Sequence, residues 1–162
     1  MRKFDTNGLK LAEFQGLLFQ ESTTNFNCSS HIFLRRFIHS DLLKTLDKNE
    51  SCFFSLDVNE GLDMIRRQFG KSTYGTIKYS KEMMFWLGYF LRYISYTRDV
   101  ETNELLRLFD YKRLIRLYYV YHTQDMEWCV SSLLDIYGYN EKIFDKNYIL
   151  LQQLKKAHQI TK

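Results

Sequence analysis

Apolar residues recur every three or four positions along most of the chain, which is the period of an amphipathic α-helix. The pattern is densest at the start of the segment 79–137. Apolar or aromatic side chains there occupy Met83, Met84, Trp86, Leu87, Phe90, Leu91, Tyr93 and Ile94. Ser80 stands at the N-cap position before them. We therefore predict a helix over about 81–97 that is apolar around most of its circumference, and a central position for it with neighbours on several sides.

The same period predicts three helices before this segment, over 9–21, from about 30 to 46, and over 57–69. In the last of them, Asp57 and Glu60 have the offset of a capping box, and Gly70 is suited to the left-handed C′ position. The stretch 51–56 is expected to be a short extended piece.

Four more helices are expected after the central one. The first is expected to be capped by Thr102, and the second follows Asp110 and ends near Tyr121. A third lies between Asp125 and Gly138, and the last runs from about 141 to 158.

These elements define an all-α fold of about six to eight helices. With no Pro and only seven Gly, the chain has few residues that interrupt helices. Aromatic residues make up 17% of it, so an aromatic-rich core is expected. We predict a single domain over 1–162, in which 81–137 forms the core and 1–78 is an N-terminal helical extension.

Charge and cysteine content argue against two classes of protein, nucleic-acid binders and metal-binding proteins, but do not identify a function. The formal charge of +4 is spread along the chain, whereas nucleic-acid binders concentrate their basic residues on one face. Cys28, Cys52 and Cys129 have no metal-ligand spacing, and Cys129 is expected to be a small buried apolar residue. Neither a signal peptide nor a membrane-spanning segment is predicted, so a cytoplasmic protein without membrane association is expected.

The familiar catalytic sequence motifs are absent, and we predict neither a cofactor nor a metal. One arrangement, Arg116 followed six residues later by His122, resembles the active-site motif of the HEPN ribonucleases. The resemblance implies that this pair would stabilise a phosphorane and move a proton. On a continuous helix the two side chains lie about 120° apart, so they converge only if the helix breaks between them. The structural alternative places Arg116 on the surface and bonds His122 to a backbone carbonyl.

A run of aromatic residues precedes His122 at Tyr118, Tyr119 and Tyr121. Phenol rings bury a large rigid area and keep a polar tip, which suits a protein interface. They can also stack on nucleic-acid bases.

The segment 84–136 carries a Phe/Trp/Tyr-rich helix, a short helix containing ELLRLF, and an aromatic stretch that ends in Tyr121-His122-Thr123. Over about 55 residues it resembles small bacterial proteins encoded beside ADP-ribosyltransferase-like toxins in suspected toxin–antitoxin modules. Most of the chain is also similar to longer Firmicutes proteins described as antitoxin or hypothetical proteins. The resemblance implies an antitoxin-like protein-interaction module whose partner is a cognate toxin or another protein. A homodimer is a further alternative.

Under this hypothesis the partner-binding residues are Tyr118, Tyr119, Tyr121 and His122. Two alternatives stay open. One is a ribonuclease that uses Arg116 and His122. The other is a DNA-binding regulator that uses Arg35 and Arg36, or a helix-turn-helix within 102–121. The spread of charge makes nucleic acid the less favoured partner.

Overall fold

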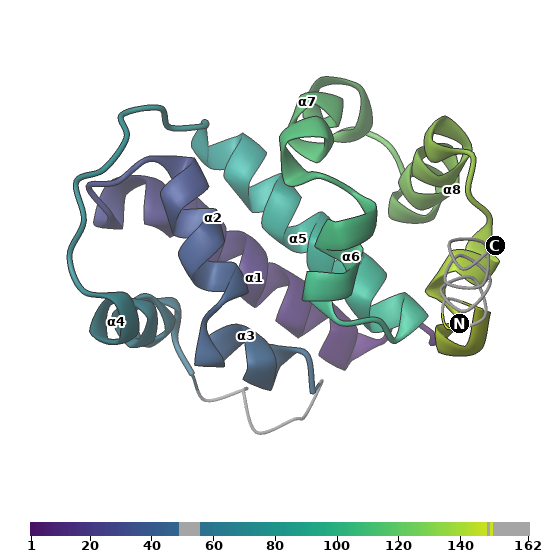
Figure 1. Ribbon diagram of the computed structural model, residues 1–162, viewed down its shortest axis with the longest axis horizontal. Coiled ribbons are helices and arrows are strands. Elements are labelled where there is room, and N and C mark those ends of the chain that lie inside the picture. Colours follow the sequence, from purple (N-terminus) through teal and green to yellow (C-terminus); the bar gives the residue numbers. More distant parts are fainter. Residues whose placement is uncertain (49–55, 149, 151–162) are drawn as a thin grey trace, which may run out of the picture. The chain divides into compact units, whose positions relative to one another are not determined.

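The computed structural model describes residues 1–48, 56–148 and 150, in two compact units, Met1–Thr123 and Gln124–Lys162. The described residues contain helices and no strands, which confirms the predicted all-α class. The helices of the first unit are α1 (Thr6–Asn25), α2 (Ser30–Ile38), α3 (Asp41–Leu46), α4 (Val58–Phe69), α5 (Lys81–Arg98), α6 (Thr102–Leu108) and α7 (Tyr111–Tyr121) (Figure 1). The second unit contains α8 (Met126–Tyr137) and the 3₁₀ helix η2 (Glu141–Phe144). One domain over 1–162 stays a prediction.

Helix α5 is the central element of the first unit, as its pattern predicts. Its N-cap is Ser80, whose hydroxyl accepts the N–H of Met83 at 3.2 Å. It ends at Asp99, which adopts the left-handed conformation with φ 52°. Helix α1 lies along α5, and α6 and α7 also contact it (Figure 1). Neighbours on several sides explain why the apolar residues of α5 extend around so much of the helix.

The approach of α1 to α5 depends on Gly88. A Cβ atom at this position would lie 2.6 Å from the carbonyl oxygen of Gln15 and 2.9 Å from the ring of Phe19. The side-chain amide of Gln15 donates back to the carbonyl of Gly88 at 2.9 Å. The two backbones therefore pack at a distance that a side chain at position 88 would prevent.

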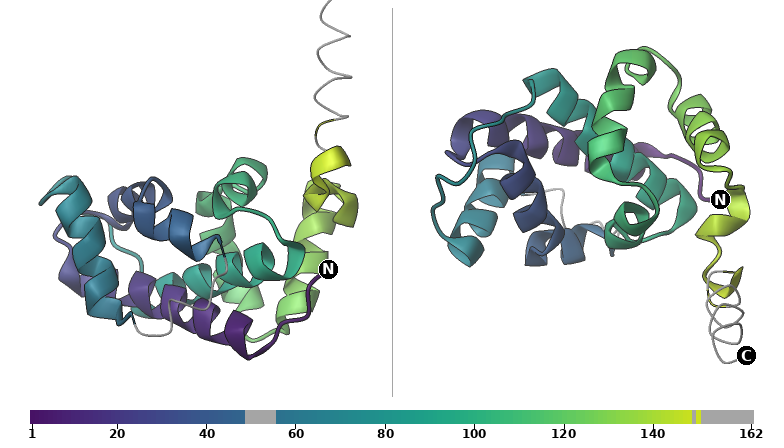
Figure 2. Two further views of the ribbon diagram at one scale, coloured as in Figure 1. Left: turned by 90° about the horizontal axis from the view of Figure 1, so that it is seen from below. Right: turned by 45° about the horizontal axis from the view of Figure 1, so that its top comes forward.

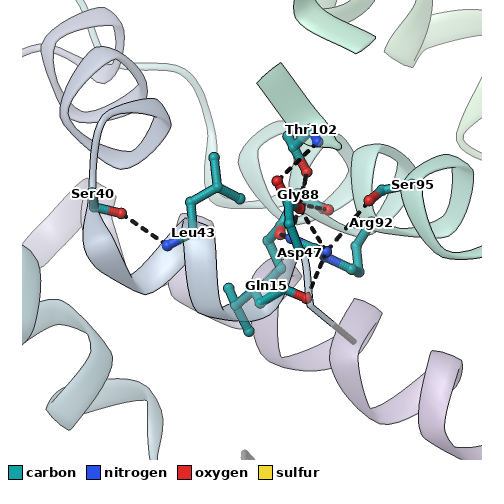
Figure 3. Close-up of polar contacts among 9 residues, drawn as sticks. Gln15, Ser40, Leu43, Asp47, Gly88, Arg92, Ser95 and Thr102 are labelled. Atoms are coloured by element: carbon teal, nitrogen blue, oxygen red, sulfur yellow. Dashed lines mark hydrogen bonds and ion pairs between the residues drawn. The ribbon is translucent and has the colours of Figure 1, made fainter. Parts of the chain in front are cut away.

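A buried arginine on α5 connects four helices (Figure 3). The Arg92 side chain is 0% exposed. Its Nε and Nη2 donate to Gln15 Oε1 on α1 at 2.9 and 2.8 Å, and its Nη1 lies 2.9 Å from Asp47 Oδ1 at the end of α3. Asp47 in turn accepts the N–H and the hydroxyl of Thr102, the first residue of α6, at 3.0 and 2.8 Å.

The fully buried charge of Arg92 is thus matched by one carboxylate and several neutral acceptors. Burial lowers the pKa of Arg92, and the Asp47 carboxylate opposes that shift. An arginine stays protonated in proteins, so the network holds a permanent ion pair. Removal of one partner from such a pair is costly because it leaves the other charge buried and unpaired.

The structure corrects two predicted helices. A single helix from 30 to 46 was expected, but Ser40 divides it into α2 and α3, since its hydroxyl accepts the N–H of Leu43 at 3.1 Å and donates to Phe37 O at 2.7 Å. The continuous helix expected from 141 begins instead as η2 and is interrupted at Asp145. Its part beyond 150 lies outside the described residues, as does 51–55 of the expected extended piece.

Other helix ends differ from their predicted positions because they are set by hydrogen bonds of polar side chains, which the period of apolar residues does not reveal. Helix α1 begins earlier than predicted because Asp5 accepts the N–H groups of Asn7 and Gly8, each at 3.0 Å. Thr102 does not cap α6: it is the first residue of the helix, and its side chain bonds to Asp47.

Helix α4 follows its prediction closely. The capping box of Asp57 and Glu60 is present, and Gly70 ends the helix with a positive φ of 69°, although its ψ of −175° differs from the left-handed conformation predicted for it. The helix packs against α1, α2 and α3 (Figure 2). Local sequence was sufficient here because both ends are set by residues within the helix or next to it.

The close packing of α1 and α5 can be tested with Gly88→Ala. Alanine favours a helix over glycine by about 1 kcal/mol, but here its methyl group would meet the backbone oxygen of Gln15. We expect a net loss of about 2 kcal/mol in the free energy of unfolding, measured by urea denaturation.

Gly61→Ala is the matched control, because the new methyl group would meet the side-chain ends of Leu18 and Phe14, which can shift. It should cost clearly less than Gly88→Ala. Equal effects of the two variants would contradict a backbone contact at Gly88.

Candidate functional site

One face of α7 forms the wall of a surface pocket. Asp110 caps the helix by accepting the N–H of Lys112 at 3.1 Å. Leu114, Ile115 and Tyr121 are buried and fix the helix against the rest of the unit. The pocket face carries Lys112, Ile115, Arg116 and Tyr119, whose spacing of three, one and three residues places them on one side of an α-helix.

The pocket, called here the α7 pocket, has a volume of about 490 Å³. Helix α2, the residue before the N-cap of α5, the first turn of α5, and α7 all contribute to it. Its lining residues are His31, Tyr79, Met83, Lys112, Ile115, Arg116 and Tyr119. The hydroxyl of Tyr119 lies 3.9 Å from the sulfur of Met83, so this ring reaches from α7 towards α5. The volume is in the range of small-molecule sites.

His31 is held between two tyrosine hydroxyls. Its Nε2 lies 3.0 Å from the hydroxyl of Tyr79, and its Nδ1 lies 3.1 Å from the hydroxyl of Tyr111. The rings also pack against each other, with centroids 5.3 Å apart for Tyr79 and 5.5 Å apart for Tyr111. Both ring nitrogens of His31 are therefore engaged, which fixes the orientation of the imidazole.

The surroundings favour the neutral imidazole. Burial lowers the pKa of His31 and the positive charge of Lys112 lowers it further, while Asp110 opposes both effects. Burial also raises the pKa of Tyr79 and of Tyr111. At neutral pH the three side chains therefore form a chain of uncharged hydrogen-bonding groups.

The charged residues that line the α7 pocket are both cations, Lys112 and Arg116. Within the described part of the chain, neither side chain forms an ion pair with a carboxylate. The nearby carboxylate of Asp110 is occupied as the N-cap of α7. The pocket is therefore electropositive and contains polar and aromatic side chains.

Arg116 and His122, the pair predicted for a ribonuclease, have different surroundings. The helix continues without a break through this stretch, and the N–H of His122 donates to Tyr118 O at 3.0 Å. The Nδ1 of His122 lies 2.8 Å from the same oxygen, and its ring stacks on Tyr118 with centroids 4.6 Å apart. The break that would let the two side chains converge is absent from α7, and the arginine shares its pocket with His31 instead.

The three predicted interface tyrosines also separate. Tyr119 is 72% exposed. Tyr118 is half-buried, with its ring 6.0 Å from that of Trp86. Tyr121 is 2% exposed and belongs to the core, so it does not contribute to the surface. The residue that follows Tyr119, Val120, was not singled out in the sequence and is 60% exposed.

The basic pair predicted for DNA binding is divided between two environments. Arg36 donates to the carbonyl oxygens of Gly70 and Phe69 at 2.7 and 3.3 Å, and thereby closes the C-terminal end of α4. Arg35 is exposed. One of the two guanidinium groups therefore has a structural role.

Other kinds of site find little support in the described part of the chain. No group of three or more His, Cys, Asp and Glu residues there could hold a metal. Cys28 and Cys129 are buried, and burial raises the pKa of the Cys129 thiol to about 11, as suits a core residue. None of the described helices has the length and apolar character needed to span a bilayer.

Sequence reasoning found Arg116 but missed the residues around it. Lys112 could have been found from its helical spacing to Arg116 and Tyr119. His31 and Tyr79 come from segments 48 residues apart, and no local pattern links them. Their contact depends on the segment that precedes α5, where the carbonyl of Ile77 accepts the N–H of Ser30 at 3.0 Å and the N–H of Tyr79 donates to Ser30 Oγ at 3.0 Å.

Comparisons with protein-family models, curated proteins and solved structures found no match to this chain. Its function is therefore inferred from its residues and their geometry.

The lowered pKa of His31 predicts a pH dependence of stability. In the unfolded chain His31 has an ordinary pKa near 6.5, whereas in the folded state its pKa is lower. In mildly acidic solution His31 is therefore protonated more often in the unfolded state than in the folded state. This contribution to stability is complete above pH ~6.5 and is lost as the pH falls towards the folded-state pKa. We expect the free energy of unfolding of the wild type to decrease between pH 7.5 and 5.5, measured by urea denaturation.

In His31→Gln, the free energy of unfolding should decrease less over this pH range than it does in the wild type. In the control His39→Gln, which removes a histidine at the end of the same helix, it should decrease as much as in the wild type. A decrease of the same size in all three proteins would show that His31 is not its source.

Proposed function

We propose that this protein is an interaction module, an antitoxin-like component of a bacterial toxin–antitoxin module, and that it binds its partner through the outward face of α7. The observation that supports this proposal is the exposure of two adjacent large apolar residues, Tyr119 at 72% and Val120 at 60%, on a helix whose other face is buried.

Helix α7 is well suited to this role because it is rigid before any partner arrives. Its inner residues Leu114 and Ile115 are buried, and its N-terminus is capped by Asp110. A contact surface that is already ordered loses less conformational entropy on binding. Exposed tyrosines on such a surface are among the residues that contribute most to binding energy in protein complexes.

The charges around the two apolar residues indicate the chemistry of the partner. Lys112, Arg113 and Arg116 are exposed on the same helix. A partner with an apolar centre and an acidic rim would complement this face. A symmetric homodimer through the same face would bring these cations close to their copies. A different protein, such as a cognate toxin, is therefore favoured over a second copy.

The two nucleic-acid alternatives are less well supported. A ribonuclease built on Arg116 and His122 needs a break in α7, and the helix is continuous. A DNA-binding pair at 35 and 36 would have to release Arg36 from the end of α4.

The proposal is tested by co-expression with the product of the adjacent gene. The two proteins should co-purify, and co-expression should relieve any growth defect that the partner causes alone. Val120→Asp should weaken the complex about tenfold or more, because it places a charge in the apolar centre of the interface. The matched control is Ile136→Asp on α8, where the aliphatic side chain is 61% exposed, and this variant should still co-purify.

Two results would contradict the proposal. One is that the proteins never co-purify and that growth is the same with or without this chain. The other is a complex that Val120→Asp and Ile136→Asp affect equally.

A further inference from the structure

The α7 pocket has features that a protein interface does not require. It combines a volume of about 490 Å³, two cations and three hydrogen-bonding rings, contributed by three separate segments of the chain. None of the residues that line it carries a negative charge. A concave site of this composition is suited to a small anionic ligand.

Lys112 and Arg116 lie one helical turn apart on the pocket face of α7. A phosphate group between them could accept hydrogen bonds from the ammonium group and from the guanidinium fork together. Neither cation is already neutralised by a carboxylate in the described part of the chain. The attraction is therefore available to a ligand.

In one of the two tautomers of neutral His31, the tyrosine–histidine chain supplies a third donor. A neutral imidazole donates from one ring nitrogen and accepts at the other. When Nε2 of His31 carries the proton, it donates to the oxygen of Tyr79, while the hydroxyl of Tyr111 donates to Nδ1. The hydroxyl hydrogen of Tyr79 is then left to point towards a ligand in the pocket.

The remaining wall is suited to a flat ring. Tyr119 is largely exposed, and its hydroxyl approaches Met83 across the pocket. Together with Ile115 these side chains form an apolar surface beside the two cations. Bases stack on tyrosine rings with little preference among them.

We propose that the α7 pocket binds a 5′-mononucleotide, with its phosphate between Lys112 and Arg116 and its base against Tyr119. This site goes beyond the proposed partner binding and does not depend on it. The residue that tests the partner interface, Val120, does not line the pocket.

The test is isothermal titration of the purified full chain with AMP, GMP, CMP and UMP, and separately with inorganic phosphate and with adenosine. The mononucleotides should bind saturably at one site. Phosphate and adenosine should each bind at least about tenfold more weakly than AMP, because each lacks one half of the recognised group. In the amide NMR spectrum of the wild type, AMP should shift resonances of His31, Tyr79 and the residues 112–119.

Variants identify the donors. Lys112→Gln and Arg116→Gln should each weaken AMP binding about tenfold, the cost of one charge-assisted hydrogen bond. Tyr79→Phe should weaken it several-fold through loss of one hydroxyl. Arg113→Gln is the matched control: it removes the same charge from the same helix outside the pocket lining, and it should change affinity less than about twofold.

Four results would overturn the proposal: no saturable binding of any mononucleotide, inorganic phosphate binding as tightly as AMP, equal losses in Arg113→Gln and Arg116→Gln, or binding of single-stranded RNA without binding of mononucleotides. None of these results depends on a protein partner. Failure of the nucleotide site is therefore distinguishable from failure of the proposed function.

Discussion

The buried guanidinium of Arg92 is the interaction on which the first unit depends. A charge removed from water must be matched by partners at fixed positions. Those partners are Gln15 on α1, Asp47 at the end of α3 and, through Asp47, Thr102 at the start of α6 (Figure 3). Helix α7 follows α6 after only two residues. By fixing the start of α6, the network therefore also restricts the position of α7 and of the α7 pocket. The position of the α7 pocket face is a consequence of this arrangement.

Much of the fold could be predicted because it is set locally. The period of apolar residues located α5, and the offset of Asp57 and Glu60 located the start of α4. The division between α2 and α3 was missed because Ser40 caps a new helix within an otherwise continuous apolar pattern. Arg92 was missed for a different reason: it lies on a helix expected to be apolar, and its partner Gln15 is 77 residues away. A long-range polar contact leaves no periodic pattern in the sequence.

The site shows the same division between local and long-range information. The position of His122 at the end of a helix, with its ring bonded to a backbone carbonyl, was one of the two alternatives that the sequence left open. Arg116 was singled out only as a possible partner of His122, but the residues that line a pocket with it are His31 and Tyr79. These residues meet because α2 and the start of α5 lie beside α7. The sequence of α7 alone could therefore indicate Arg116 and the exposed face of the helix. It could not indicate the pocket, which also needs residues from other segments.

The most direct test of the buried ion pair is a double-mutant cycle on Arg92→Met and Asp47→Leu, with the free energy of unfolding measured by urea denaturation. Each single variant leaves one charge without its partner and should lose about 3–5 kcal/mol. The double variant replaces both charges by apolar groups and should lose at least about 2 kcal/mol less than the sum of the two single losses. Strictly additive losses, or single losses below about 1 kcal/mol, would contradict the central role of Arg92.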